Sequence, residues 1–363
     1  MKNRLICAIL LIALIAAVAL SACAAPTPTT SPTTTAAPTT TAAPPKVIEL
    51  IYSDTTPAQV PKCQHTQAWA KKIEDMSNGR VKFTFYWSNS LIPQPDIIKG
   101  VSQGVADISY IPFNVNLTPL NYEIMYLPFM GYTSMEMGTK IWDQLYAKFP
   151  VLQEEFTKPG VKLLNANLMP PQQMHFTKKA VKTPADMKGM KLIASGKQAD
   201  LVSAAGGSPV ELGNIMEMYT SLERGMVEGV VNHYPVMTVF GCMPVVPYHT
   251  NFGKGGISMG LHGLIMNPKT YNSLPADIQK YIDELNPWYV EEMLKIDNAE
   301  IERAMGIGRE AKHTFVDLTP AEIEPWAKLG KPLQEAWIKE MEAKGLPARA
   351  LYDEAMKLIA QSK

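Results

Sequence analysis

The chain has 363 residues and carries 34 basic and 34 acidic side chains, so its formal net charge at neutral pH is zero. It contains no lysine-rich block and no strongly basic helical segment, which excludes binding to nucleic acid or to a membrane surface through positive charge. The residues that follow Pro45 are numerous enough to form two lobes, each with its own hydrophobic core.

The chain begins with an apolar run, residues 5–20, which follows two basic side chains and ends in the sequence Leu-Ser-Ala-Cys at Cys23. This order of charge, apolar run and small residues is typical of a secretory signal, and the cysteine indicates a bacterial lipoprotein. A true membrane span needs about 20 apolar residues, and this run is shorter. We therefore expect residues 1–22 to be removed as a signal peptide and the Cys23 thiol to carry a lipid.

The segment after this cysteine has a composition that cannot build a hydrophobic core. Residues 24–45 contain only alanine, threonine, proline and a single serine. We expect residues 23–45 to form a lipidated cysteine followed by an extended linker. Cleavage before Cys23 removes two of the 34 basic side chains and no acidic one, which leaves a net charge of about −2. The lipid, and not surface charge, would then supply membrane contact.

Predicted strands and helices alternate in the first part of the mature chain. Strands are expected at residues 47–52, 81–87 and 107–111, where β-branched and aromatic side chains cluster or alternate. Apolar side chains at helical spacing predict a helix that contains Trp69 and ends before Asn78-Gly79, and a short helix at residues 96–104. This alternation favours a mainly parallel sheet covered on both faces, with a ligand site at the carboxyl ends of its strands.

The same pattern restarts after Gly160 and predicts a second α/β lobe. Strands are expected at residues 161–164 and 190–194, and helices at residues 197–205 and 216–226. The second of these helices precedes a further apolar segment that begins Gly-Val-Val.

Capping residues and one long helical segment complete the predicted elements. Thr183 before proline, and Thr319 with Glu322 three residues later, are N-terminal helix signals. Residues 273–313 have a helical pattern with one break at Pro287, long enough to brace both lobes. The predicted lobes comprise residues 46–168 and 256–290 for lobe 1, and residues 169–255 and 291–363 for lobe 2 with the brace helices.

One short motif suggests a hydrolase. Gly256-Ile-Ser258-Met-Gly260 matches the G-x-S-x-G nucleophile elbow, and a triad would be completed by Asp283 and His313. The elbow requires a strand that ends at the serine, whereas here a strand-like segment follows it. A lipid-anchored surface hydrolase that uses Ser258 is therefore the alternative and not the leading prediction.

Other chemical motifs give no support for a metal or a cofactor. The six histidines never fall at helical i, i+3 or i+4 spacing with one another, and no phosphate-binding glycine loop is present, so we expect neither a metal nor a nucleotide cofactor. Cys63 and Cys242 show no metal-ligand spacing. They either form a disulfide or are small buried thiols.

Six segments in the mature chain carry a resemblance to a known family when they are taken together. They are residues 70–82 (AKKIEDMSNGRVK), 98–108 (IKGVSQGVADI), 126–129 (YLPF), 181–191 (VKTPADMKGMK), 217–229 (EMYTSLERGMVEG) and 271–279 (YNSLPADIQ). In this order and spacing the chain resembles the solute receptors of tripartite ATP-independent periplasmic (TRAP) transporters, of the dicarboxylate-receptor (DctP-like) type. The resemblance covers nearly the whole mature chain.

This resemblance implies a monomeric two-lobed α/β receptor of the periplasmic-binding-protein type, which is not an enzyme and has no cofactor. It would close on a small organic solute by a hinge motion and deliver it to a permease of a small and a large membrane subunit, driven by an ion gradient. The receptor would work outside the cytoplasmic membrane. A sensor that reports a solute to a signalling partner is a further alternative.

The chain departs from the family at the residues that usually bind an organic acid. The arginine that pairs with the solute carboxylate is replaced by Ile193, and a second arginine by Gln173, while the family asparagine matches Asn232. A carboxylate without its bidentate arginine loses roughly 2 to 5 kcal/mol. We therefore expect a solute that is less acidic and more apolar or aromatic than a C4-dicarboxylate.

The predicted ligand-binding residues come from both lobes. Gln173 and Asn232 would hold the solute beside Ile193 through their amide groups, with further polar contacts from His233 and Tyr234. In lobe 1, three aromatic side chains lie at or near predicted strand ends, where a cleft would form: Tyr52, Trp87 and Phe113. As an alternative, Lys197 or Arg224 replaces the missing arginine.

Overall fold

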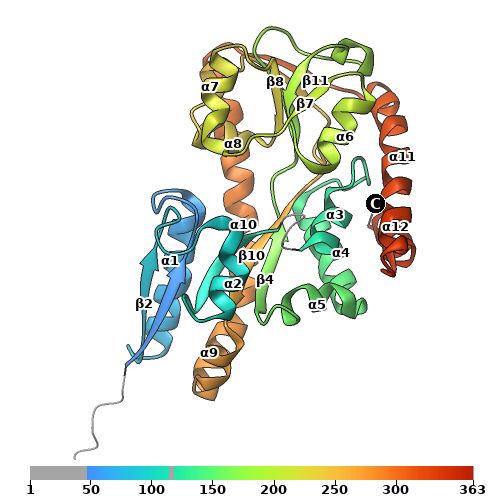
Figure 1. The fold of residues 1–363 in the computed structure, drawn as a ribbon. Helices are drawn as coiled ribbons and strands as arrows, with labels where there is room; N and C mark the ends of the chain where they lie inside the picture. The colour runs from blue at the N-terminus through green and yellow to red at the C-terminus, as the bar shows by residue number, and fades with distance from the viewer. Residues whose placement is uncertain (1–46, 114–117, 363) are drawn as a thin grey trace, which may run out of the picture. The chain divides into compact units, whose positions relative to one another are not determined.

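The computed structural model describes residues 47–113 and 118–362. The predicted signal peptide, Cys23 and the linker lie outside the described residues. Within the described part, the chain folds into helices packed around two β-sheets (Figure 1). None of the helices in this part combines the length and the apolar composition that crossing a membrane requires.

The first sheet has five strands in the order β2-β1-β3-β10-β4. Strand β1 pairs in parallel with β2 and β3, while β10 runs antiparallel to both of its neighbours. The strands are β1 (Ile48–Ser53), β2 (Val81–Tyr86), β3 (Ile108–Pro112), β4 (Lys162–Leu168) and β10 (Leu261–Met266). The strands expected at residues 47–52, 81–87, 107–111 and 161–164 are confirmed, and β4 continues four residues beyond its expected end.

Alternate residues of these strands pack into two different hydrophobic cores, because successive side chains of a strand point to opposite faces. Leu264 of β10 packs on one face with Trp69 of α1 and with α10, and Ile265 packs on the other face with the helices that follow β3. The helices of this region are α1 (Pro61–Met76), η1 (Gln94–Asp96), α2 (Ile97–Ser102), α3 (Pro119–Tyr126), α4 (Met135–Lys148), α5 (Pro150–Thr157) and α9 (Pro268–Ser273).

The second sheet has six strands in the order β11-β9-β5-β8-β6-β7. They are β5 (Gln173–Phe176), β6 (Lys191–Ile193), β7 (Ser208–Val210), β8 (Gly229–Asn232), β9 (Tyr248–Asn251) and β11 (Thr314–Asp317). The helices between them are η2 (Pro184–Met187), α6 (Gly196–Ala204), η3 (Ile215–Glu217), α7 (Met218–Glu223), α8 (Tyr234–Val239) and η4 (Met243–Val245). The predicted second set of α/β elements is therefore confirmed.

Both sheets are mixed, and their parallel share is smaller than expected. In the second sheet only β5 runs antiparallel to both neighbours. Strand β5 follows the point where the chain leaves the first sheet, and β10 follows the point where it returns. In each sheet, the strand that directly follows a crossing from the other sheet is therefore the strand that runs antiparallel to both of its neighbours.

The two crossing segments, residues 169–172 and 257–260, are hydrogen-bonded to each other. The backbone N–H of Met169 donates to the Gly260 carbonyl (2.8 Å), and the N–H of Gln172 donates to the Ser258 carbonyl (2.9 Å). Gly256, next to this ribbon, has a φ of +59°, and a Cβ there would lie 2.5 Å from the Gln172 carbonyl oxygen. Only glycine fits this position without strain.

A single helix of 35 residues, α10 (Ala276–Glu310), passes both sheets. It packs against α1 and β4 in the region of the first sheet and against α8 and η4 in the region of the second. The expected break at Pro287 is wrong, because the helix continues through this residue. Pro287 is exposed, so water can bind the carbonyl that loses its helical partner.

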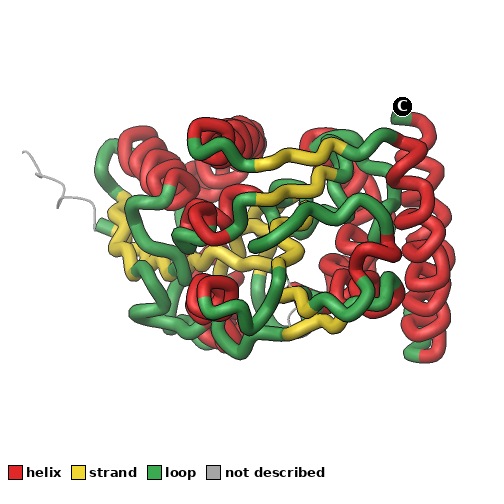
Figure 2. The backbone as a smooth tube through the Cα atoms, turned by 90° about the horizontal axis from the view of Figure 1, so that it is seen from above, coloured by secondary structure: helices red, strands yellow, loops and turns green. Residues whose placement is uncertain are grey.

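The last two helices are α11 (Pro320–Ala343) and α12 (Ala348–Gln361). They lie side by side at one side of the compact unit formed by residues 45–363 (Figure 2). The predicted caps are confirmed: Thr319 and Thr183 each form a capping box with the acidic residue three positions later. Helix α12 packs against α4, which belongs to the region of the first sheet. The division into two lobes by residue ranges stays a prediction.

Candidate ligand-binding site

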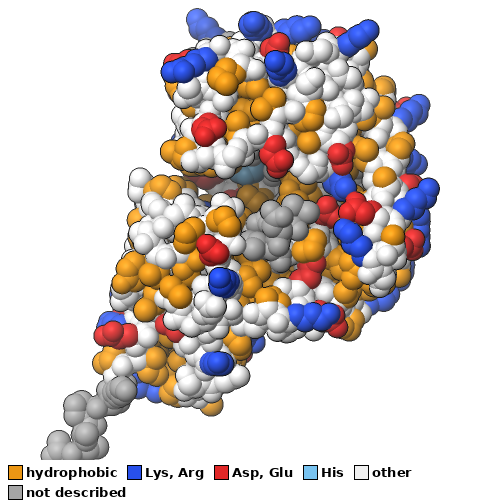
Figure 3. Space-filling model, viewed as in Figure 1, with side chains coloured by type: hydrophobic (Ala, Val, Ile, Leu, Met, Phe, Trp, Pro, Cys, Tyr) orange, Lys and Arg blue, Asp and Glu red, His pale blue; other side chains and the backbone are white. Residues whose placement is uncertain are grey.

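Polar side chains gather where strands of the first sheet end. Strand β3 ends at Pro112 and β4 ends at Leu168, and β10 begins at Leu261 between these two ends. Strand β1 ends at Ser53, on the other side of β3. The face of the molecule shown in Figure 3 is hollowed between the region of α7 and α8 and the region of α1, and histidine side chains are visible inside the hollow. The carboxyl ends of strands are the usual place for a ligand in such sheets.

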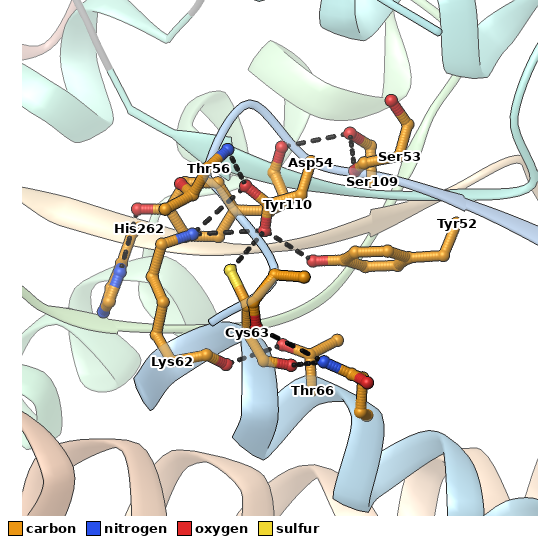
Figure 4. A network of polar contacts seen from close by, with 12 residues as sticks. Tyr52, Ser53, Asp54, Thr56, Lys62, Cys63, Thr66, Ser109, Tyr110 and His262 are labelled. Carbon is orange, nitrogen blue, oxygen red and sulfur yellow. Dashed lines mark hydrogen bonds and ion pairs between the residues drawn. The ribbon is translucent and has the colours of Figure 1, made fainter. Parts of the chain in front are cut away.

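An internal ion pair lies at the end of β1. Asp54 is only 1% exposed and accepts hydrogen bonds from the Tyr52 hydroxyl (2.9 Å), the Thr56 backbone N–H (2.8 Å) and the Lys62 ammonium group (3.1 Å). Figure 4 shows Lys62 reaching from α1 toward Asp54 and Tyr110, and its Nζ lies 3.4 Å from the centre of the Tyr110 ring. The single positive charge here is therefore already balanced.

His262, the second residue of β10, connects the next two strand ends. Its Nε2 lies 2.7 Å from Asn167 Nδ2, and its Nδ1 lies 3.1 Å from the Tyr110 hydroxyl oxygen. Asn167 Nδ2 also donates to the Leu168 carbonyl, which fixes the orientation of the amide. Since an amide nitrogen only donates, His262 Nε2 accepts and the ring proton lies on Nδ1. Burial, together with the charges of Lys62 and His233, lowers the pKa of His262 to about 3.

Asp297 brings a carboxyl group from α10 to the same histidine. Its Oδ2 lies 3.6 Å from His262 Nε2, and 13% of its side chain is exposed. Burial raises the pKa of Asp297 to about 8, although the charge of Lys62 acts in the opposite direction. At neutral pH this group is mainly protonated and His262 is neutral, so the two do not form an ion pair despite their distance.

The second sheet contributes the end of β8. Asn232 accepts a hydrogen bond at its Oδ1 from the His233 backbone N–H (2.9 Å). The His233 side chain is buried, and its Nδ1 has no hydrogen-bond partner among the described residues. Burial lowers the pKa of His233 to about 4. A positive charge on His233 would also disfavour protonation of His262, which is one of the causes of the lowered pKa of His262.

Three other predicted residues of the second sheet have internal partners. The Gln173 amide accepts from the Phe252 backbone N–H (2.7 Å) and donates to the Gly253 carbonyl (3.1 Å). Ile193 is buried in an apolar cluster with α7 and α8. The Tyr234 hydroxyl donates to Asn251 Oδ1 (2.7 Å). Gln173 pairs with Asn232 in the strand register, so both residues lie at the same end of the two paired strands.

The predicted aromatic residues of the first sheet differ in their surroundings. Tyr52 is fully buried, and its hydroxyl belongs to the Asp54 network. Trp87 is partly exposed and stacks on Phe85, with the ring centres 5.2 Å apart. Phe113 packs in the core against α4 and α5, which makes it the weakest of the three as a ligand contact.

The two basic side chains that were considered as replacements for the arginine lie outside the network around His262. The Lys197 ammonium group is within 3.6 Å of Asp200 and 3.9 Å of Glu340. Arg224 is exposed at the end of α7.

The residues of the suggested catalytic triad each have a different partner. The Ser258 hydroxyl accepts from Gln198 Nε2 (3.2 Å), Asp283 accepts from the Tyr271 hydroxyl (2.6 Å), and His313 is hydrogen-bonded to His249 (3.0 Å). These contacts argue against the hydrolase alternative, because a triad requires the serine and the histidine to be in contact.

Cys63 and Cys242 are free and buried, so the second of the two expectations for them holds. Burial raises the pKa of the Cys63 thiol to about 12 and that of Cys242 to about 11. Both are therefore protonated at neutral pH and behave as small apolar side chains.

Sequence reasoning missed the side chains that meet around His262: Lys62, Tyr110, Asn167 and Asp297. A polar residue inside an apolar strand was a usable signal for Asn167 and His262. Asp297 gave no signal, because an aspartate in a long helix resembles any exposed acidic residue.

The described residues form two β-sheets that are covered by helices and joined by two crossing segments. This arrangement indicates a two-lobed binding protein. The chain belongs to family 7 of the bacterial extracellular solute-binding proteins (DctP), whose family model matches residues 52–341. The resemblance seen in the sequence is thereby confirmed, and the protein is a solute-binding protein.

Individual relatives agree with this assignment. The outer membrane transporter protein TsaT of Comamonas testosteroni is 25% identical over 292 residues, which are 78% of this chain and 83% of that protein. A TRAP solute-binding protein from Rhodoferax ferrireducens, in complex with copurified benzoate, has a similar fold, with a TM-score of 0.77 and 22% identity over 87% of this chain and 98% of that one.

A marine metagenome TRAP solute-binding protein specific for aromatic acid ligands, in complex with 3-hydroxybenzoate, has a TM-score of 0.78 and 23% identity. It covers 87% of this chain and 99% of its own. Both structures show that the fold is shared.

Proposed function

We propose that this protein is the receptor of a TRAP transporter, which captures a small organic solute between its two sheets and delivers it to a permease of two membrane subunits. The observation that carries this proposal is that both sheets end in buried polar side chains, Asn167 and His262 in the first and His233 in the second. A solute held between these ends contacts both sheets, and it therefore favours the closed state by its differential affinity. Family membership supports the same function.

The solute, we propose, is less acidic and more apolar or aromatic than a C4-dicarboxylate. Ile193 supplies no hydrogen bond at the position where relatives of this type place an arginine. Among the residues that the structure describes, the only cation in the network around His262 is Lys62, and Asp54 already balances its charge. Proteins of the same fold bind benzoate and 3-hydroxybenzoate, which supports an aromatic solute with at most one carboxylate.

A binding screen tests both statements. Residues from Pro45 onward form one compact unit and can be studied without the N-terminal segment. A solute at 100 times its dissociation constant stabilises the folded state by about 2.7 kcal/mol, which raises the melting temperature measurably. We expect aromatic monocarboxylates or neutral aromatic solutes to give the shift. A larger shift with C4-dicarboxylates would contradict the solute class, and a folded protein that responds to no organic solute would contradict the receptor function.

We further propose that Cys23 is lipidated and anchors the receptor outside the cytoplasmic membrane. The apolar run and the small residues that precede Cys23 support this assignment. In bacterial cells that express the full chain, the protein is expected in the membrane fraction and labelled by radioactive fatty acid. The Cys23→Ser variant should lose the label. An unlabelled full-length protein that is nevertheless secreted would contradict the anchor.

A further inference from the structure

Two polar oxygen atoms near His262 have no hydrogen-bond partner among the described residues: Asn167 Oδ1 and Asp297 Oδ2. Asn167 is 1% exposed, and both side chains approach the same ring nitrogen, His262 Nε2. A buried polar atom without a partner costs roughly 1 to 3 kcal/mol, and native proteins keep few of them. Asn167 lies next to the end of β4 and Asp297 lies on α10, and the meeting of their side chains at one ring nitrogen points to a ligand.

The hydrogen-bond capacity of this pair is defined by the network around it. His262 Nε2 already accepts from Asn167 Nδ2, so it cannot also accept the proton of the Asp297 carboxyl group. Asp297 has its pKa raised to about 8 and keeps this proton at neutral pH. The pair therefore presents one O–H donor, on Asp297, and one carbonyl acceptor, on Asn167.

We propose that Asn167 and Asp297 bind a hydroxyl group of the solute. A hydroxyl oxygen accepts from the Asp297 carboxyl group while its hydrogen is donated to Asn167 Oδ1, so one group satisfies both partners. This assignment rests on the receptor function proposed above and deepens it, because it adds a hydroxyl group to the chemistry of the solute.

Other polar groups match this pair less well. A carboxylate only accepts hydrogen bonds, so it would leave Asn167 Oδ1 unpaired and place negative charge against it. An ammonium group only donates, so it would leave the O–H donor of Asp297 without an acceptor. An apolar group would leave both partners unsatisfied.

The groups around this pair are partly accessible. The Asp297 side chain is 13% exposed and the Lys62 side chain 16% exposed, so water reaches part of each side chain although Asp297 Oδ2 itself is buried. His233 Nδ1, which follows the end of β8 in the second sheet, is also buried without a hydrogen-bond partner among the described residues. It provides a polar contact on the opposite side of a solute whose hydroxyl group is bound to Asn167.

Matched pairs of compounds test the proposal in the wild-type protein by calorimetry at pH 7. The pairs are 3-hydroxybenzoate with benzoate, mandelate with phenylacetate, and 2-hydroxy acids with the corresponding deoxy acids. In the pair that binds, the hydroxylated member is expected to bind at least about tenfold more tightly, which corresponds to about 1.4 kcal/mol. Equal affinities would assign the two oxygens to a trapped water molecule and would overturn the proposal.

Variants then test the residues. In Asn167→Ala and Asp297→Ala the preference for the hydroxylated compound is expected to fall to about twofold or less, while the affinity for the compound without the hydroxyl stays nearly unchanged. Asp297→Asn keeps a donor and an acceptor and should keep most of the preference. A preference that persists in both alanine variants would overturn the proposal.

Asn165 offers a matched control on the same strand. Its Nδ2 donates to Asn286 and its Oδ1 is also buried and unpartnered, but it has no contact with His262. Asn165→Ala should therefore keep the wild-type preference. If an alanine variant fails to fold, two measurements still test the proposal. They are the ratio of the affinities for the hydroxylated and the unhydroxylated compound in the wild type, and the same ratio in Asp297→Asn.

The outcomes separate this inference from the receptor function. If only compounds without a hydroxyl group bind, the protein is a receptor and the hydroxyl assignment is wrong. If no compound of either kind binds to the folded protein, the receptor function itself fails.

Discussion

Asp54 is a buried carboxylate that forms an ion pair with Lys62. It is almost completely buried, and it accepts hydrogen bonds from a lysine, a tyrosine and a backbone N–H. Such an ion pair contributes little net stability compared with apolar residues of the same volume, but removal of one partner leaves a buried charge without compensation. The pair therefore defines the position of Lys62 more than it stabilises the fold.

Replacement of Asp54 by alanine is expected to lower the free energy of unfolding by about 3 to 5 kcal/mol. The loss has two causes: an uncompensated Lys62 charge, and unpaired donors on Tyr52 and Thr56. Urea denaturation at pH 7 measures it.

The matched control is Asp75→Ala, because Asp75 also pairs with a lysine of the same helix, Lys71. There the side chains are 65% and 66% exposed, and an exposed pair of this kind contributes about 1 kcal/mol at most. If Asp54→Ala and Asp75→Ala lowered the free energy of unfolding by similar amounts, the burial of the Asp54–Lys62 pair would have no effect on its contribution, and the prediction would be wrong.

At the scale of elements, periodicity and capping residues were sufficient to predict most strands and helices. The alternation in residues 81–87 and the capping box at Thr319 depend only on local geometry, so they are visible in the sequence. The direction of β5 and β10 is not local. It follows from where the chain crosses between the sheets, and no pattern within either strand encodes it.

The long helix α10 shows a second limit of local reasoning. Proline predicts a break because it removes one hydrogen bond, but the packing of a helix of 35 residues outweighs that loss when the proline faces solvent. The same helix brings Asp297 beside His262, although 34 residues separate them in the chain. A site assembled from β4, β10 and α10 is therefore invisible to spacing rules.

On the scale of the whole molecule, buried neutral histidines couple stability to pH. Burial lowers the pKa of all six histidines, and the largest effects are at four of them: to about 3 for His175 and His262, about 4 for His233 and about 2 for His249. Their usual value is 6.5, so between about pH 6.5 and 3 the unfolded state binds more protons than the folded state. Their contribution to stability is complete above pH 6.5 and is lost as the pH falls.

Asp297 acts in the opposite direction. Its folded pKa is about 8 and the usual value is 3.8, so the folded state binds the additional proton between these values, and its contribution decreases as the pH rises. Asp143 acts in the same direction as Asp297, because burial raises its pKa to about 6. Four histidines against these two carboxyl groups leave a net uptake of about two protons on unfolding near pH 5.

We therefore expect the free energy of unfolding to fall by about 2 to 3 kcal/mol between pH 6 and pH 5, since each proton contributes about 1.4 kcal/mol per pH unit. Urea denaturation as a function of pH measures this slope. In His233→Phe the slope should decrease by about one proton, because His233 is buried and its Nδ1 has no partner to lose. A stability that stays constant across this range would show that these histidines are not held neutral.

The ribbon formed by residues 169–172 and 257–260 has a mechanical consequence for a receptor that must open and close. Sliding of one crossing segment along the other would break the backbone hydrogen bonds that join them, whereas bending of the ribbon across its plane preserves these bonds. Because α10 connects the same two regions, rotation about the ribbon has to bend or tilt this helix as well. The two sheets are thus restricted to one main direction of relative motion, so the same strand ends meet each time the protein closes.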